Sequence, residues 1–161
     1  MAKLVRMLLL DVDGVLTDGQ LYYGARGEAL KAFHVRDGHG IKQMVAAGVR
    51  VVVISGRRSP AVLRRCRELG ISEVRLGVAD KLAELRGLCA RLKVTLNEVA
   101  CIGDDTPDAP VMRAVGLSFA VKDAHPDALA AAQRITRLPG GRGAVREVCD
   151  TLLELQRVRR A

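Results

Sequence analysis

The chain has 161 residues, of which 49% are hydrophobic and 27% are charged, and its formal net charge is +8. This balance excludes a disordered chain, the apolar stretches are too short to cross a membrane, and the length predicts a single domain over residues 1–161. The apolar run before Asp11 has no cleavage-like segment, so we expect no secretory signal and a cytoplasmic location.

Short apolar runs alternate along the chain with longer segments of helical period. In chain order we expect a strand at 5–10, a β-hairpin formed by 20–23 and 28–33, a helix at 38–47, a strand at 49–54, a helix at 59–69, a strand at 73–76, a helix at 81–92, a strand at 99–102, a helix at 107–114, a strand at 117–121, a helix at 126–132 and a last helix from 143 to about 158. Continuous apolar strands separated by amphipathic helices are typical of a parallel sheet covered on both faces. The predicted fold class is therefore α/β, a doubly wound and mostly parallel sheet with a β-hairpin insertion.

The cysteines and the net charge indicate which kinds of site and partner the protein can have. The four cysteines are widely scattered and show no CxxC spacing, which favours buried reduced thiols over disulfides or a metal cluster. The positive charge raises nucleic-acid binding as a hypothesis. Aromatic residues make up only 2% of the chain, however, and most arginines are dispersed, so little is available to stack on bases. We expect an anionic small-molecule partner and no specific nucleic acid.

Asp11 and Asp13 directly follow the first predicted strand, just before Gly14. Ligands of doubly wound sheets bind beyond the carboxyl ends of the strands, which is where both carboxylates would lie. One carboxylate can attack phosphorus while the other protonates the leaving oxygen and later activates water. The alternative is that the two aspartates only cap a turn.

A second acidic cluster, Asp104, Asp105 and Asp108, follows the strand predicted at 99–102. It should lie at the same edge of the sheet as Asp11. Carboxylate oxygens suit Mg²⁺, and without a cation these like charges would repel one another. The alternative is an acidic loop that caps the next helix, a role that suits Asp108. Two acidic strand ends in one small domain favour Mg²⁺ as a cofactor.

Two further motifs can hold a phosphoryl group. Ser55, Gly56 and Arg57 follow the strand predicted at 49–54 and offer a hydroxyl, backbone amides and a guanidinium. Lys81 begins a predicted helix and can neutralise the nucleophile and the phosphate together. Taken singly, the first motif is equally a serine-glycine turn, and an isolated lysine is more often a surface residue.

The order of these motifs, DxD, then Ser, then Lys, then GDDxxD, resembles the four motifs of the haloacid dehalogenase superfamily. The resemblance implies that Asp11 is the nucleophile and Asp13 the general acid/base. It also implies that Asp11, the backbone carbonyl of Asp13 and Asp104 coordinate Mg²⁺, and that Ser55 and Lys81 contact the phosphoryl group. Many superfamily members carry a cap domain over the substrate. Neither 14–54 nor 56–80 has room for one, so we expect a capless enzyme.

Over nearly its whole length the chain further resembles one family, the 3-deoxy-D-manno-octulosonate 8-phosphate phosphatases. The matching stretches are 11–19, 21–23, 33–38, 103–105, 110–112, 123–126 and 136–147. That family is tetrameric, and its hairpins form a central barrel. The resemblance therefore implies a homotetramer, in which the Gly-Gly-Arg segment around Arg142 reaches a neighbouring active site from the C-terminal arm.

The same resemblance implies a set of substrate-contacting residues: Asp13, His34, Val35, Arg36, Asp37, Gly38, Lys42, Arg57, Arg65, Lys81 and Arg142. Arginines suit a sugar acid that carries both a carboxylate and a phosphate. His34 is equally interpreted as a packed histidine after the hairpin, and Arg65 as helix surface.

The implied reaction is Mg²⁺-dependent hydrolysis of 3-deoxy-D-manno-octulosonate 8-phosphate to the free sugar acid and phosphate, a step of lipopolysaccharide biosynthesis. Two alternatives remain open. One is a phosphatase for a related nine-carbon keto sugar acid phosphate, and the other is a non-catalytic binding subunit on the same fold.

Overall fold

A parallel sheet forms the centre of the computed structural model, which describes residues 4–160 and side chains as far as Val158. Its strand order is β5-β4-β1-β6-β7-β8. The strands are β1 (Met7–Leu10), β4 (Arg50–Ser55), β5 (Glu73–Leu76), β6 (Val99–Gly103), β7 (Leu117–Ala120) and β8 (Arg134–Ile135). Every residue of the central strands β1 and β6 is buried, as expected for strands that are covered on both faces.

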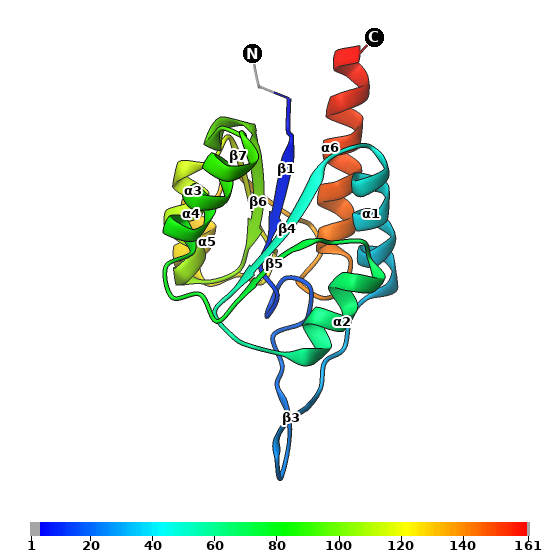
Figure 1. Cartoon of the computed structure of the whole chain (residues 1–161), viewed down its shortest axis with the longest axis vertical. Coiled ribbons are helices and arrows are strands. Elements are labelled where there is room, and N and C mark those ends of the chain that lie inside the picture. Colours follow the sequence, from blue (N-terminus) through cyan, green and yellow to red (C-terminus); the bar gives the residue numbers. More distant parts are fainter. Residues whose placement is uncertain (1–3, 161) are drawn as a thin grey trace.

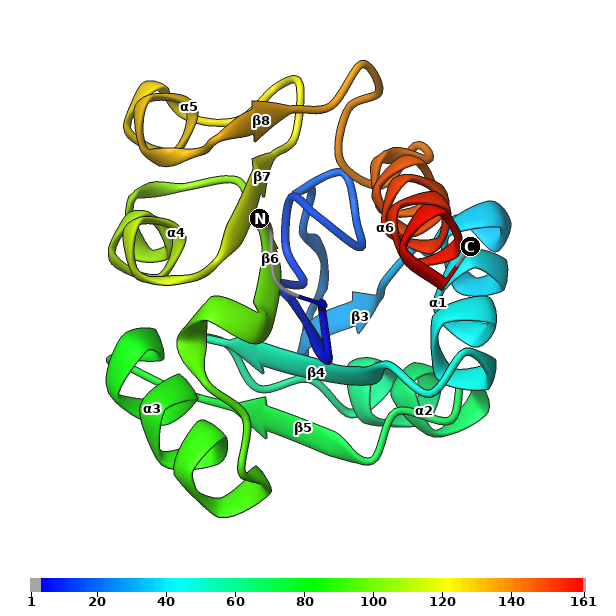
Figure 2. The same ribbon diagram turned by 90° about the horizontal axis from the view of Figure 1, so that it is seen from above.

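Helices cover both faces of this sheet, as Figure 2 shows from above. α1, α2 and α6 lie on one side, and α3, α4 and α5 lie on the other. The helices are α1 (Val35–Ala46), α2 (Pro60–Glu68), α3 (Lys81–Leu92), α4 (Ala109–Ala114), α5 (Pro126–Ala131) and α6 (Ala144–Arg160), with short 3₁₀ turns η1 (Leu96–Glu98) and η2 (Thr106–Asp108). The predicted doubly wound α/β class is therefore confirmed.

A two-stranded antiparallel hairpin, β2 (Tyr22–Gly24) and β3 (Gly27–Leu30), projects beyond the carboxyl edge of the sheet (Figure 1). The predicted hairpin is thus present. Within the part of the chain that the structure describes, no segment builds a separate cap, and the hairpin is the insertion nearest the strand ends. Among the same residues, no helix combines the length and apolar character that crossing a bilayer requires.

The start of α1 and the edge strand β8 differ from the prediction. α1 begins at Val35 rather than at residue 38, because the side chain of His34 accepts a hydrogen bond from the backbone N–H of Arg36 and caps the helix there. The edge strand β8 was missed, since it is only Arg134–Ile135 and both residues are exposed. The predicted state of the cysteines is confirmed, because all four are free and buried.

Candidate active site

The loop after β1 carries Asp11 and Asp13 to the carboxyl edge of the sheet. The hydroxyl of buried Thr17 accepts hydrogen bonds from the backbone N–H groups of Gly14 (3.3 Å) and Gly19 (3.2 Å). Gly14 has a φ of +86°, which L side chains rarely adopt. The loop therefore closes on itself, and it holds the buried Asp11 and the half-buried Asp13 at fixed places.

A buried ionic cluster forms around Lys81, the first residue of α3. Its ammonium Nζ lies 2.9 Å from Asp11 Oδ1 and 2.7 Å from Asp108 Oδ1. All three side chains are nearly inaccessible to solvent, at 8%, 11% and 8% exposure for Lys81, Asp11 and Asp108. A lysine is almost never buried this deeply unless it is paired. The surface interpretation of Lys81 is therefore wrong.

The site gathers more negative charge than Lys81 balances. Carboxylate oxygens of Asp11, Asp104 and Asp108 lie within 4.8 Å of one another. Burial raises the pKa of Asp104, and the neighbouring charge of Asp11 raises it further. Burial also raises the pKa of Asp11, with Asp108 as the next contributor. A hard divalent cation would relieve this crowding, and an all-oxygen donor set suits Mg²⁺.

Asp108 differs from the other two carboxylates because both of its oxygens are engaged. Oδ1 accepts a hydrogen bond from Lys81, while Oδ2 accepts from the backbone N–H groups of Asp104 (2.9 Å) and Asp105 (3.3 Å). The capping role that the sequence suggested for Asp108 is thus present, and Asp108 also holds Lys81. Asp11 and Asp104 are left as the carboxylates available to a cation.

A cavity of about 370 Å³ opens beside this cluster. The side chains brought together around it include Asp11, Asp13, Ser55, Arg57, Lys81 and Asp104. Ser55, the last residue of β4, is buried, and its hydroxyl accepts a hydrogen bond from the backbone N–H of Arg57 at 3.3 Å. All four motifs thus converge on one cavity of a size that suits a small ligand.

Other predicted site residues lie at the start of α1, outside the lining of this cavity. Asp37 is buried, and its carboxylate accepts a hydrogen bond from the backbone N–H of Arg146 (2.9 Å), which ties α1 to α6. Gly38 packs directly against the guanidinium of Arg65, which also lies 5.9 Å from the centre of the Phe33 ring. Arg65 is therefore more than helix surface, since it packs between α1 and α2.

The remaining predicted residues are exposed or half-buried. Val35 and Lys42 are exposed on α1, and half-buried His34 caps that helix. Arg36 and Arg142 line a separate groove of about 520 Å³ beside α6. The guanidinium of Arg142, 67% exposed, lies 3.9 Å from Asp18 of the same chain. Within one chain, neither arginine reaches the cavity beside Asp11.

The C-terminal glycines support the site loop of their own chain. The backbone N–H of Gly141 donates to the carbonyl of Val15 (2.9 Å), and the N–H of Gly140 donates to Asp123 (2.9 Å). A side chain at Gly140 would overlap the backbone carbonyl of Gly14. The expectation of a reaching arm did not include this contact, which clamps the loop that carries Asp11.

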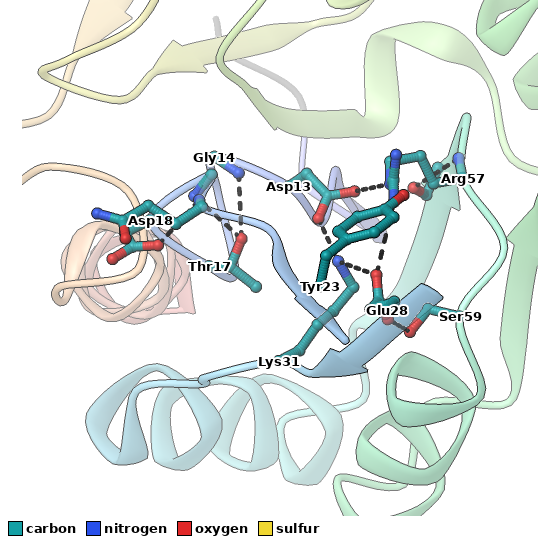
Figure 3. Close-up of polar contacts among 12 residues, drawn as sticks. Asp13, Gly14, Thr17, Asp18, Tyr23, Glu28, Lys31, Arg57 and Ser59 are labelled. Carbon is teal, nitrogen blue, oxygen red and sulfur yellow. Dashed lines mark hydrogen bonds and ion pairs between the residues drawn. The ribbon is translucent and has the colours of Figure 1, made fainter. Parts of the chain in front are cut away.

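Sequence reasoning also missed two charged residues of the hairpin. Figure 3 shows Lys31 pointing toward Asp13 and Glu28, and Glu28 in contact with Ser59. The available signal was a lysine inside a predicted strand, which resembles any solvated edge residue. Only the tertiary structure places it next to Asp13.

Comparison with known proteins identifies the family of this chain. Residues 73–145 match the model of the haloacid dehalogenase-like hydrolases. The 3-deoxy-D-manno-octulosonate 8-phosphate phosphatase of Escherichia coli K12 is 50% identical over 155 residues, which are 96% of this chain and 82% of that protein. The chain belongs to the 3-deoxy-D-manno-octulosonate 8-phosphate phosphatase family.

Solved structures of this phosphatase family have the same fold. The Yersinia pestis phosphatase superposes with a TM-score of 0.92 at 50% identity, covering 94% of this chain and 82% of that one. The Moraxella catarrhalis phosphatase, solved with magnesium, phosphate and 3-deoxy-D-manno-octulosonate, has a TM-score of 0.92 at 42% identity, covering 95% and 88%. The predicted family and the predicted enzyme class, a phosphomonoesterase, are confirmed.

Proposed function

We propose that the protein hydrolyses 3-deoxy-D-manno-octulosonate 8-phosphate to the free sugar acid and phosphate, with Mg²⁺ as cofactor. The observation that carries the proposal is the convergence of Asp11, Asp13, Lys81 and Asp104 on one cavity at the carboxyl edge of the sheet. The Moraxella catarrhalis relative, whose structure holds magnesium, phosphate and the sugar acid, supports the choice of cofactor and product.

In the proposed first step, a carboxylate oxygen of Asp11 forms a bond to phosphorus, and the bond from phosphorus to the sugar oxygen breaks. Asp13 gives its proton to the departing sugar oxygen. Asp13 then takes a proton from water, which attacks phosphorus, releases inorganic phosphate and regenerates Asp11. An aspartate nucleophile requires no separate base to ionise it, which fits a site where Asp11 already faces the ammonium of Lys81.

The side chains of Asp11 and Asp104, together with the backbone carbonyl of Asp13, would hold Mg²⁺. The bound ion supplies positive charge that neutralises the phosphoryl oxygens. Lys81 and Ser55 would hold the phosphoryl group, and Lys81 is kept in place by Asp108. Arg57, 41% exposed at the rim of the cavity, lies 3.7 Å from both Asp13 and Glu28, and would exchange these long contacts for an anionic substrate.

The rest of the substrate-binding set is proposed to act in a homotetramer. Exposed hydrophobic side chains on the hairpin, namely Leu21, Tyr22, Tyr23 and Leu30, support its burial between subunits. In such an assembly, the start of α1 (His34 to Gly38), Lys42 and Arg65 would wall the site, and Arg142 would contribute charge to the active site of a neighbouring subunit. We further propose that the reaction is a step of lipopolysaccharide biosynthesis in the cytoplasm. The whole chain, residues 1–161, is proposed to form one domain.

A phosphate-release assay on purified protein with and without Mg²⁺ tests the function. We expect turnover of the eight-carbon substrate that depends on Mg²⁺ and is abolished in Asp11→Asn. Phosphate release that survives Asp11→Asn would refute the nucleophile assignment. A higher kcat/KM for the nine-carbon keto sugar acid phosphate would show that this compound, not the eight-carbon one, is the preferred substrate. The absence of any turnover would favour a non-catalytic binding subunit.

A further inference from the structure

Lys31 is a buried cation on the hairpin side of the site. It follows the last residue of β3, and its side chain is only 2% exposed. Burying an ammonium without partners costs several kcal/mol, so a lysine in such a place requires a partner. The partners of Lys31 are both carboxylates, and one of them is the proposed acid/base, Asp13.

The contacts of Lys31 form a chain from the hairpin to the site. Its ammonium donates a hydrogen bond to Asp13 Oδ1 and lies 3.1 Å from Glu28 Oε2 (Figure 3). The other oxygen of Glu28 accepts a hydrogen bond of 2.6 Å from the hydroxyl of Ser59. Ser59 precedes α2, but its hydroxyl caps no N–H group of that helix. Because Ser59 is buried and bound to Glu28 instead, the position of Lys31 is fixed from two elements.

The two oxygens of Asp13 are held unequally. Oδ1 is bound by the buried Lys31, whereas among the residues that the structure describes the basic group facing Oδ2 is Arg57 Nε, at the longer distance of 3.7 Å. Arg57 is a weaker restraint because it is 41% exposed and also contacts the hydroxyl of Tyr23 (3.3 Å) on β2. Both Asp13 and Arg57 line the cavity of the site. Lys31 thus fixes one edge of the carboxylate and leaves the other edge for the ligand.

We propose that Lys31 is a positioning residue, which aims the carboxyl group of Asp13 at the leaving-group oxygen and couples its direction to the hairpin. This inference rests on the proposed function. Lys31 and Glu28 thus bring the hairpin into direct contact with the acid/base residue of the site. Surface ion pairs are too weak and mobile for this purpose, whereas an ammonium that is only 2% exposed and lies between two carboxylates is held in one place.

The leaving group provides the test, because a good leaving group does not need a proton from Asp13. We would measure kcat/KM, which reports the phosphoryl-transfer step, for p-nitrophenyl phosphate and for two alkyl esters, propyl phosphate and the eight-carbon sugar acid phosphate. Lys31→Met is compared with Lys93→Met, an exposed lysine at the end of α3. Circular dichroism and thermal unfolding check that each variant folds.

For Lys31→Met we expect kcat/KM to fall about 10- to 100-fold on both alkyl esters but less than about threefold on the aryl ester. A displaced general acid should lose part of the roughly 10²- to 10⁴-fold that general acid catalysis contributes. Lys31→Arg keeps a cation and should recover part of the loss, and Lys93→Met should match wild type. Ser59→Ala leaves no unpaired charge, so it keeps the test valid if Lys31→Met does not fold. It should show a smaller loss with the same dependence on leaving group.

Equal losses on alkyl and aryl esters, or no loss at all, would overturn the positioning role while the proposed function stands. If the wild-type protein hydrolyses propyl phosphate but not the sugar acid phosphate, the proposed substrate is wrong. The positioning role of Lys31 can still be tested by comparing propyl phosphate with p-nitrophenyl phosphate. Failure of the wild type to hydrolyse any of the three esters would overturn both.

Discussion

Gly14→Ala is the sharpest single change that the site offers. Gly14 lies in the loop after β1 with a φ of +86°, and a Cβ at this position would overlap the carboxylate of Asp104. The overlapping atoms are the end of a short side chain, so Asp104 has to turn away from the cluster. The substitution therefore moves a proposed metal ligand without removing it.

Gly14→Ala has two expected costs, one in folding stability and one in Mg²⁺ affinity. An L residue in the left-handed region costs about 1–2 kcal/mol of folding stability. Gly48, at the end of α1, has a φ of +81°, and a Cβ at this position would meet no atom within 4 Å, so Gly48→Ala carries the backbone cost alone. Displacing Asp104 should in addition weaken Mg²⁺ binding by about tenfold or more, which corresponds to about 1.4 kcal/mol of binding free energy.

Two measurements on wild type, Gly14→Ala and Gly48→Ala check this reasoning. Urea unfolding without Mg²⁺ should show a similar loss of unfolding free energy for the two variants. In Gly14→Ala, the cost of turning Asp104 away is offset because Asp104 then repels Asp11 less. Titration calorimetry with Mg²⁺ should show weakened binding for Gly14→Ala only. Wild-type affinity in Gly14→Ala would refute the assignment of Asp104 as a ligand.

Three further predictions concern buried contacts. Lys81→Met should abolish turnover and cost about 3–5 kcal/mol in urea unfolding, because it leaves Asp11 and Asp108 buried without their cation; a stable, active variant would contradict the cluster. Gly140→Ala should lower kcat by displacing the carbonyl of Gly14, whereas Gly48→Ala should keep wild-type kcat. Equal kcat values for the two variants would show that Gly140 does not hold the loop of Asp11 in place. Since burial raises the pKa of the Cys66 thiol to about 11, thiolate forms only at alkaline pH, and a thiol reagent at pH 8 should label none of the buried cysteines until urea is added.

The elements with strong local signals were predictable from the sequence. The central strands are unbroken apolar runs, and motifs at their carboxyl ends must meet because parallel strands share one edge. That rule was sufficient to bring Asp11, Ser55 and Asp104 together. The absence of a cap was predicted separately, from the resemblance to the haloacid dehalogenase superfamily and the short intervals between its motifs.

The parts that were missed depend on contacts between distant segments. Nothing near Lys31 in the sequence distinguishes it from a solvated lysine, because it pairs with Asp13 from another element and with Glu28, which Ser59 holds. Asp108 satisfies a local capping pattern, but its contact with Lys81 forms only because α3 packs beside it in the folded chain. Local patterns thus locate the strand ends, whereas the ion pairs between them appear only in three dimensions.

The clamp of Gly140 and Gly141 on the loop after β1 has a consequence for the order of folding. The hydrogen bond from Gly141 to Val15 joins the loop after β1 to a segment that is synthesised much later. Contacts of such long range form late, and chains emerge from the ribosome with the N-terminus first. A nascent chain can therefore assemble β1 and β4 while the loop that carries Asp11 is still open. The loop would be fixed for metal binding and phosphoryl transfer only after the segment that contains Gly140 and Gly141 has been synthesised, so a chain that lacks this segment should fold in part and remain inactive.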